Sequence, residues 1–499
     1  MFLANAGRRG TLPSKNFLYG RKGPWPQPSP TEPLGTSPAV LHLPWQETVD
    51  WYCHIGFRYL RDLFLYGPVA LVRAIRFRGL PQIDDAAMAT VLTHGLYSRF
   101  LSPLDAIDVK TFAGTYDPND GGVYYKIDFT PIEAVQPYSG MFVGKTITLM
   151  RRTNATSTDF SVVAIAVGGK PLVLVPKDAN AWELAKYYVL MGCSYATLFT
   201  THPNVHFPYD TINAVTKGAI PVHHLLFKLL IPHLRFSLVL DNAVLQSPAS
   251  VISNLRANLY DPFTAAADAG LMSFFVAGFK GLKGNSAYPG YHYPSNRDEL
   301  RVPPTRYGDF LRLYFEPFHE LAVAVVREMP VDQLGYVEEW SRWIRTWLPT
   351  FPHLPFRHED HAGVAASRAK LAFALAVVLW DVSVVHSTDH RDFAANVPVE
   401  WKCFRLREAP PSSREEKPVD RAKLATRVDL FKSHLAHRMF FAPTNVTTLL
   451  DVDYGFESAT LRAAQATFKT QLRAIDASLA GKDIPRYAAI DLMAASIQY

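Results

Sequence analysis

Two pairs of histidines in this chain have the spacing of metal ligands on a helix. His202 and His206 are four residues apart, and so are His386 and His390. On an α-helix, residues four apart lie on one face, so each pair could present two imidazole nitrogens to one ion. Neutral imidazole is the commonest metal ligand among protein side chains and suits iron, zinc and copper. The spacing therefore makes both pairs candidates for metal binding.

The second pair ends a segment, residues 369–390, that is apolar nearly all round. A helix without a polar face must lie inside a large protein, and buried imidazoles cost free energy unless they are bonded. Facing helices could therefore bring four nitrogens together. A second interpretation stays open, because seventeen histidines give some pairs of this spacing by chance, and such pairs can be structural.

Other motifs carry less chemistry. The loop with His353, His358 and His361 is rich in proline, which predicts a solvated surface turn. The glycines between 278 and 285 lack the Lys-Ser/Thr that completes a phosphate loop. The sequence has no GxSxG and no HExxH, so α/β-hydrolase and zincin chemistry find no support.

The composition is that of a large globular protein with one to three domains. The 499 residues are 48% hydrophobic and 13% aromatic, which is ample for a buried core. The net charge is +6, but the basic residues are spread along the chain, so no nucleic-acid partner is expected. The three cysteines are too far apart for a disulfide framework or a cysteine-rich zinc site.

The cellular compartment is predicted from two kinds of segment that we do not find in the sequence, a signal peptide and a membrane-spanning helix. The N-terminal residues have no apolar signal region. The longest apolar run, residues 371–385, is shorter than the roughly 20 residues that cross a bilayer. We therefore expect a soluble, cytoplasmic protein.

The elements that must position the histidines form a mainly α-helical fold. Residues 1–44 are rich in Pro, Gly and Ser and predict a flexible arm, and residues 45–499 follow as one body. Residues 110–175 contain β-branched and aromatic runs between turn residues, which predicts a small antiparallel sheet. Beyond residue 178 the pattern is helical, so we expect a large bundle around a buried central helix.

Residues 45–77 predict amphipathic helices with interleaved arginines. We expect these helices to pack on the body with the arginines in water. Two other roles stay open: contact with a membrane surface, and a cover over an apolar substrate entrance.

Several segments in order resemble the lipoxygenases, the non-haem iron dioxygenases of polyunsaturated fatty acids. The segment HLLFKLLIPHLR, residues 224–235, is similar to the family's His-Pro-x-x-Lys-Leu-Leu-x-x-His-x-Arg, with Leu in place of Pro. WDVSVVH, residues 380–386, is similar to Trp-x-x-Ser-x-x-His, and AWELAK, residues 181–186, resembles the start of the metal-bearing helix. The resemblance covers about residues 80–499 and implies the catalytic domain alone, a compact form without the N-terminal β-barrel of many members.

The resemblance also implies the site. Its ligands to a mononuclear non-haem iron would be the imidazoles of His202, His206, His386 and His390 and the terminal carboxylate of Tyr499, after a tail AASIQY that is similar to the family's Asn-Ser-Ile-x-Ile. Val244 falls where the family has the Ala or Gly that steers oxygen. No side chain is expected to be catalytic beyond the metal centre.

This chain departs from the family pattern at the first pair, where three residues instead of four separate the histidines. Strict counting puts Thr201 where His202 is wanted, and we expect an ordinary helical turn to deliver His202. The stretch after His390 also lacks a glutamine that bonds around the site in many members.

The activity that the resemblance implies is insertion of O2 into a polyunsaturated fatty acid to give a hydroperoxide. Two alternatives stay open. One keeps the fold and the metal, iron or manganese, but uses another apolar substrate or rearranges a hydroperoxide. The other is a metal-free lipid-binding protein. The sequence gives no prediction of the oligomeric state.

Overall fold

The computed structural model describes the chain from residue 45 onward, with gaps. The described residues are 45–240, 261–265, 293–301, 305–348, Phe351, His353, Leu354, Phe356, 361–402, 404–441 and 446–497. The arm predicted for residues 1–44 lies outside them.

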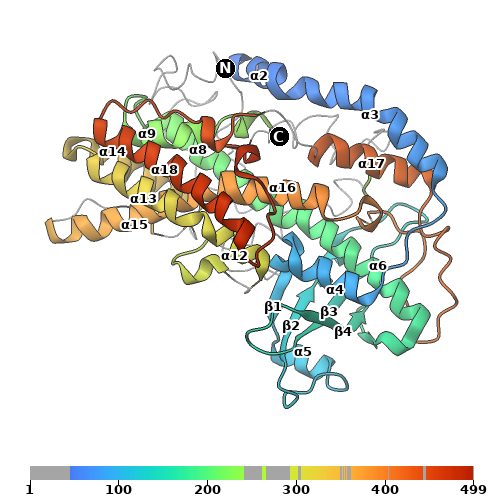
Figure 1. Ribbon diagram of the computed structural model, residues 1–499. Helices are drawn as coiled ribbons and strands as arrows, with labels where there is room; N and C mark the ends of the chain where they lie inside the picture. The colour runs from blue at the N-terminus through green and yellow to red at the C-terminus, as the bar shows by residue number, and fades with distance from the viewer. Residues whose placement is uncertain are drawn as a thin grey trace.

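The described chain is mainly helical, as predicted, with a small sheet at one end (Figure 1). Two series of consecutive helical segments, called here the first and the second line, run through its centre. Each line carries one histidine pair. The first line is α6 (Ala179–Ala196), a π-helical segment (Thr197–Thr201), α7 (His202–Asn204) and α8 (Phe207–Ala219). The second line is α15 (His361–Trp380), a π-helical segment (Asp381–Val385) and α16 (His386–Ala395).

Further helices in the described part of the chain lie around these two lines or, in the case of α5, beyond the sheet (Figure 1). They are α2 (Trp45–Trp51), α3 (Phe57–Arg76), α4 (Asp85–His94), α5 (Ala106–Thr111), α9 (Leu225–Leu230), α12 (Arg306–Leu313), α13 (Phe315–Glu328), α14 (Leu334–Trp347), α17 (Arg427–Phe441) and α18 (Ala459–Ser478). Side chains cap several of their starts: the carboxylate of Asp84 accepts the Ala87 amide at α4, and Thr305 Oγ1 accepts the Gly308 amide at α12. Such caps satisfy amide groups that have no partner within the helix.

The sheet is a five-stranded antiparallel meander in the order β1-β2-β3-β4-β5. Its strands are β1 (Leu101–Pro103), β2 (Val123–Asp128), β3 (Thr146–Arg152), β4 (Phe160–Val167) and β5 (Leu172–Leu174). β2 to β5 lie within the predicted range 110–175, whereas β1 precedes it. Three residues that end in proline carry too little alternation to predict a strand.

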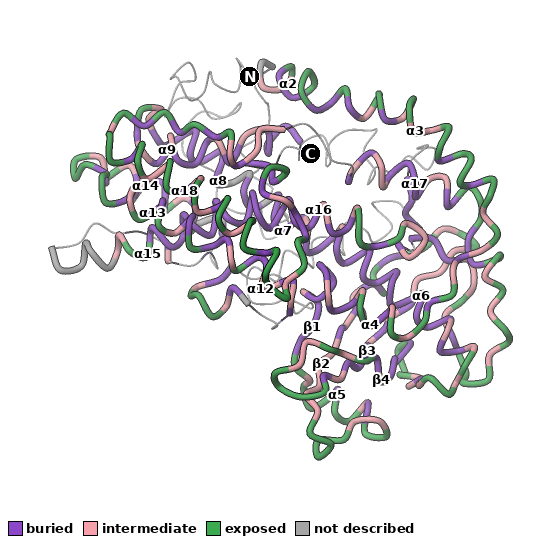
Figure 2. The backbone as a smooth tube through the Cα atoms, viewed as in Figure 1, coloured by how far each residue is buried: buried purple, intermediate pink, exposed green. Residues whose placement is uncertain are grey.

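Helix α6 approaches the sheet closely at a glycine. A Cβ atom at Gly192 would overlap the ring of Phe129, which follows β2. The missing side chain lets the central helix lie against the sheet end of the molecule, and nearly every residue from Ala181 to Ala196 is buried there (Figure 2). The sheet therefore helps to fix the helix that carries the first histidine pair.

The second line is buried as its composition predicted. Residues 371–390 are all buried in the core. Within the described chain, one helix, Ser367–Ala395, is long and apolar enough to cross a membrane, but its most apolar stretch is entirely buried inside the protein. It is therefore a core helix, and its α15 part packs against α13.

Helix α3 agrees with our expectation only in part. Its fully buried residues are Arg58, Asp62, Ala70 and Ala74, whereas most of its large apolar side chains face outward. Arg61, Arg73 and Arg76 are exposed as expected, but Arg58 is buried and the apolar face does not pack on the body. Helical periodicity locates an apolar face, but it does not say what that face contacts.

Candidate metal centre

Each histidine pair follows directly on a π-helical segment. Thr197–Thr201 ends immediately before His202, and Asp381–Val385 ends immediately before His386. A π-turn holds one residue more than an α-turn and leaves main-chain groups without their usual partners. Side chains help here: Asn204 Nδ2 donates to the Thr200 carbonyl at 2.6 Å, and the Ser383 hydroxyl donates to the Leu379 carbonyl. The extra residue sets the direction in which each pair points.

The four-residue spacing had suggested that the first pair lies on one ordinary helical turn. The structure shows that it does not. His202 opens the short helix α7, the chain turns at Val205, and His206 precedes α8 in a non-ideal conformation (φ −109°, ψ −76°). Pro203 and Pro208 lie in the first turns of α7 and α8, where a missing N–H removes no helical bond. The expected ordinary turn is wrong, but both histidines still reach the centre.

The four histidines converge on one point. Their potential ligand nitrogens all lie within 4.8 Å of one another. His206 Nε2 is 2.8 Å from His202 Nε2 and 3.1 Å from His386 Nε2. The ring centroids of His202 and His390 are 4.5 Å apart. Metal–nitrogen bonds of about 2 Å place ligands up to about 4 Å apart around one ion, so this cluster has the dimensions of a metal site.

Burial keeps these imidazoles neutral. His386 and His390 are 0% and 3% exposed, His206 is 7% exposed and His202 is partly buried. Burial lowers the pKa of His206 to about 3 and holds the pKa values of His202, His386 and His390 well below the usual range. A neutral imidazole keeps one nitrogen lone pair, which is the form that binds metals.

The donor set fits a cation better than a hydrogen-bonded cluster. His206 Nε2 faces two other Nε2 atoms but has only one in-plane site, either a hydrogen or a lone pair, so it cannot form a full hydrogen bond with both. A cation among the lone pairs satisfies them together. The residues present therefore fit a bound metal ion.

Buried acids and tyrosines hold the second helical line beside the cluster. Tyr209 donates to Asp381, and Tyr307 donates to Asp389. Arg99 also contacts Asp389, at 3.1 Å. Burial raises the pKa of Asp381 to about 8 and also raises that of Asp389. These contacts join α8, α12 and the segment after α4 to the helices that carry His386 and His390.

Aromatic rings cover one side of the cluster. Phe441, the last residue of α17, has its ring centroid 5.3 Å from that of His390 and 6.4 Å from that of His202. Phe393 packs on Phe441 at 4.5 Å. These rings keep water from that side of the imidazoles.

The described C-terminal residues lie against the same centre. The Ala494 amide donates to Ser387 Oγ at 2.9 Å, directly beside His386. The Ala495 amide donates to the Thr447 carbonyl at 2.9 Å, and Ser496 Oγ donates to the Arg235 carbonyl at 2.9 Å. Ile497 is fully buried.

Two predicted site residues, Val244 and Tyr499, lie outside the described residues. The structure brings the other four, His202, His206, His386 and His390, into one cluster. The proline-rich loop considered as a competing cluster lies partly outside the described residues as well. No role was predicted for His233, which contacts the C-terminal segment and Tyr454. Only its place in the HLLFKLLIPHLR motif could have drawn attention to it.

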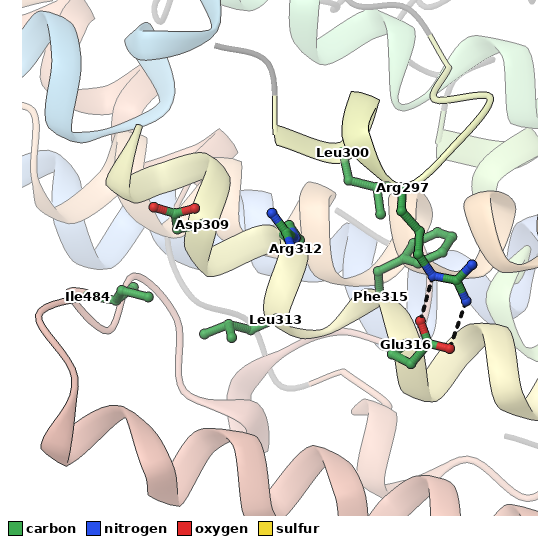
Figure 3. Close-up of a pocket in the computed structure, with 8 residues that line it drawn as sticks. All are labelled: Arg297, Leu300, Asp309, Arg312, Leu313, Phe315, Glu316 and Ile484. Carbon is green, nitrogen blue, oxygen red and sulfur yellow. Dashed lines mark hydrogen bonds and ion pairs between the residues drawn. The ribbon is translucent and has the colours of Figure 1, made fainter. Parts of the chain in front are cut away.

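The described residues also line a surface pocket of about 490 Å³, whose lining residues are drawn in Figure 3. Its walls come from α12, α13, the segment before α12 and Ile484, and they include none of the four histidines. Arg297 and Glu316 form an ion pair across one side. Charged walls of this kind do not suit an apolar ligand.

Comparison with known proteins identifies the architecture. The structure superposes on coral 8R-lipoxygenase with a TM-score of 0.68 at 16% identity, over 95% of this chain and 79% of that one. The chain has the lipoxygenase fold. The manganese lipoxygenase of Gaeumannomyces graminis matches this lipoxygenase-like protein with a TM-score of 0.66 at 14% identity, over 91% of this chain and 92% of that chain.

Sequence comparison agrees with the fold. The mouse polyunsaturated fatty acid lipoxygenase ALOX12 is 23% identical over 260 residues, which are 49% of this chain and 37% of that protein. The match therefore spans well under half of this relative. No family model matches the sequence.

Proposed function

We propose that this lipoxygenase-like protein is a non-haem iron dioxygenase that inserts O2 into a polyunsaturated fatty acid to give a hydroperoxide. The observation that carries the proposal is the convergence of four neutral imidazoles within 4.8 Å in a lipoxygenase fold. The mouse relative named for polyunsaturated fatty acids and a similar lipoxygenase structure in complex with arachidonate support the substrate class.

The proposed ligands are the imidazoles of His202, His206, His386 and His390 and the terminal carboxylate of Tyr499. Manganese is the alternative metal, which the likeness to the manganese lipoxygenase supports. A bound metal would supply the one-electron redox chemistry for this reaction: it would take up the electron, with the proton, of the hydrogen atom lost from the methylene between two double bonds, and both would return to the peroxyl radical formed by O2 addition to give the hydroperoxide.

The chain itself provides positioning and exclusion of water. Burial keeps the histidines neutral and able to donate their lone pairs. Asp389, held by Arg99 and Tyr307, fixes the turn of α16 that carries His390. Phe441 and Phe393 form an apolar wall beside the imidazoles, against which a hydrocarbon chain can pack and from which water is excluded.

We also propose that residues 45–499 act as one catalytic domain in the cytoplasm. A single cluster of buried apolar residues extends from Trp51 to Ile497, which supports one body. Cys53 and Cys193 are free thiols, and free thiols persist in reducing compartments.

The test combines metal analysis with an assay on one purified sample. We expect close to one equivalent of iron or manganese and the growth of conjugated-diene absorbance with linoleate or arachidonate under air. A metal-replete sample that forms no diene would overturn the fatty-acid reaction and leave another apolar substrate. Less than about a tenth of an equivalent of metal after growth in iron and manganese would overturn any redox role.

A further inference from the structure

Helix α3 exposes an unusual amount of apolar surface. The outward side chains of α3 include Phe57, Leu60, Phe64, Leu65, Val69, Leu71, Val72 and Ile75, each between 42% and 71% exposed. Residues 57–75 of a helix extend about 27 Å. Soluble monomers rarely expose a continuous apolar patch of this size unless something binds there. We call this set of eight side chains the α3 face.

The α3 face is exposed because the other side of the helix is fixed to the protein by polar contacts. Arg58 Nη2 donates to the Met439 carbonyl of α17 at 2.9 Å. Asp62 contacts Arg61 at 3.0 Å and Arg438 of α17 at 3.8 Å. These buried charges cannot turn outward without losing their partners. These contacts therefore hold the helix with its apolar residues exposed, and much of α3 is coloured as exposed in Figure 2.

The charged residues around the α3 face indicate what kind of partner binds it. Among residues 47–78, the exposed charged side chains are all basic: Arg61, Arg73, Arg76 and Arg78. The acidic Asp50 and Asp62 are buried, and Glu47 is paired with Lys217 at 2.6 Å. A helix with an apolar face and flanking arginines is the pattern that lies in the interface of an anionic membrane.

We propose that the α3 face docks this protein on an anionic lipid membrane. Its apolar side chains enter the boundary between headgroups and acyl chains, and Arg73, Arg76 and Arg78 contact lipid phosphates. The cytoplasmic leaflet is the anionic one. The proposal that the α3 face binds a membrane does not depend on the proposed reaction.

The position of α3 links docking to the metal centre. Figure 1 shows α2 and α3 along one edge of the molecule with α17 beside them. α17 ends at Phe441, whose ring contacts those of His390 and His202. Under the proposed function, a fatty acid would leave the bilayer on the side of the protein where Phe441 covers the histidines. This use of the surface rests on that function, whereas docking does not.

Vesicle sedimentation with the full chain tests the proposal. We expect binding to phosphatidylcholine vesicles that contain phosphatidylserine and much weaker binding to phosphatidylcholine alone. The double variant F64S/L65S removes the two most exposed side chains of the α3 face and should weaken binding at least about tenfold. The variant R73E/R76E reverses two charges and should weaken binding to the anionic vesicles by about tenfold or more.

The control variant is I107S/V331S, which removes two equally exposed apolar side chains, 76% and 66% exposed, from elsewhere on the protein. It should bind vesicles like the wild type. An absence of vesicle binding by the wild type would overturn the proposal, as would equal losses in the α3-face and control variants. A wild-type dimer that F64S/L65S converts to monomers, without vesicle binding, would assign the face to a second copy instead.

The thermal midpoint of each variant shows whether a loss of vesicle binding comes from unfolding. Residues of the α3 face contact water, so their replacement by serine should leave the thermal midpoint within a few degrees of the wild type. The charge reversal leaves all apolar side chains in place. If F64S/L65S failed to fold, loss of binding in R73E/R76E would still support the proposal, and full binding in that variant would overturn it.

Discussion

His233 Nδ1 lies 2.7 Å from the carbonyl oxygen of Ala495, a residue 262 positions away in the chain. A carbonyl only accepts, so Nδ1 carries the hydrogen. Nε2 then accepts from the Tyr454 hydroxyl at 2.8 Å. One buried imidazole thereby fixes both the C-terminal segment and the segment before α18.

His233→Leu should release this clamp. The variant leaves the buried Ala495 carbonyl without its donor, so the free energy of unfolding should fall by about 1–3 kcal/mol. If the Tyr499 carboxylate binds the metal, metal content should fall as well. Denaturant unfolding and metal analysis check both effects. Tyr454→Phe is the control: it keeps the bond to Ala495 and should retain the metal. Full metal content in H233L would remove the tail from the ligand set.

Burial of His233 also predicts a pH dependence. Burial lowers the pKa of His233 to about 4 from the ordinary value near 6.5. A histidine with a lowered folded-state pKa contributes stability that is present above the unfolded-state value and is lost as pH falls toward the folded-state value. Between pH 7 and pH 4 this contribution should shrink by about 3 kcal/mol.

The measurement compares denaturant unfolding of metal-free wild type and His233→Gln across that window. The wild type should lose about 3 kcal/mol more than H233Q between pH 7 and pH 4. Parallel pH curves for the two proteins would contradict the prediction, because the remaining buried histidines titrate in both.

Loss of a metal ligand should be visible without any assay. His206→Ala and His386→Ala each remove one imidazole from the cluster, so metal affinity should fall by more than about a hundredfold, beyond the effect usual for an outer hydrogen-bond partner. The control His223→Ala removes an exposed imidazole and should keep the metal. A chelator should lower the thermal midpoint of the wild type and of H223A, but not that of H206A. Wild-type metal content in H206A would contradict the site.

The contact of α6 with the sheet predicts opposite effects for two glycines. Gly192→Ala places a Cβ atom into the ring of Phe129 and should destabilise the fold by about 1–3 kcal/mol. At Gly335, on α14, nothing lies within 4 Å of the new atom, so Gly335→Ala should be neutral or stabilising by up to about 1 kcal/mol. The midpoints of denaturant unfolding measure both effects. Equal effects of the two substitutions would contradict the close packing of α6 against Phe129.

The sequence predicted the parts of the centre that depend on local periodicity. The four-residue spacing of His386 and His390 at the end of an apolar segment led directly to a buried pair, and the structure confirms the burial. The lipoxygenase fold followed from motifs in the family's order and is confirmed by the superposition. The small antiparallel sheet is confirmed too, although β1 lies before the predicted range.

Long-range contacts could not be predicted in this way. The bond from Tyr209 to Asp381 joins residues 172 positions apart, and nothing local in either residue identifies the other. The π-helical segments were missed because they keep the composition of ordinary helices. The burial of Arg58 and the exposure of the apolar face of α3 were not predicted, because Arg58 and Asp62 find buried partners on α17, which a single-helix pattern cannot show.

The two π-helical segments give the metal centre a shared sensitivity to chain length. Each segment winds one extra residue into a helix whose ends are held by the core. Deletion of a single residue from either segment would let an ordinary helix form with both ends in place. Insertion of one residue into the α-helix before the segment would instead rotate the histidine that follows by about 100° around the helix axis. The centre thus tolerates a change in the number of residues before each pair only at the π-helical segments themselves.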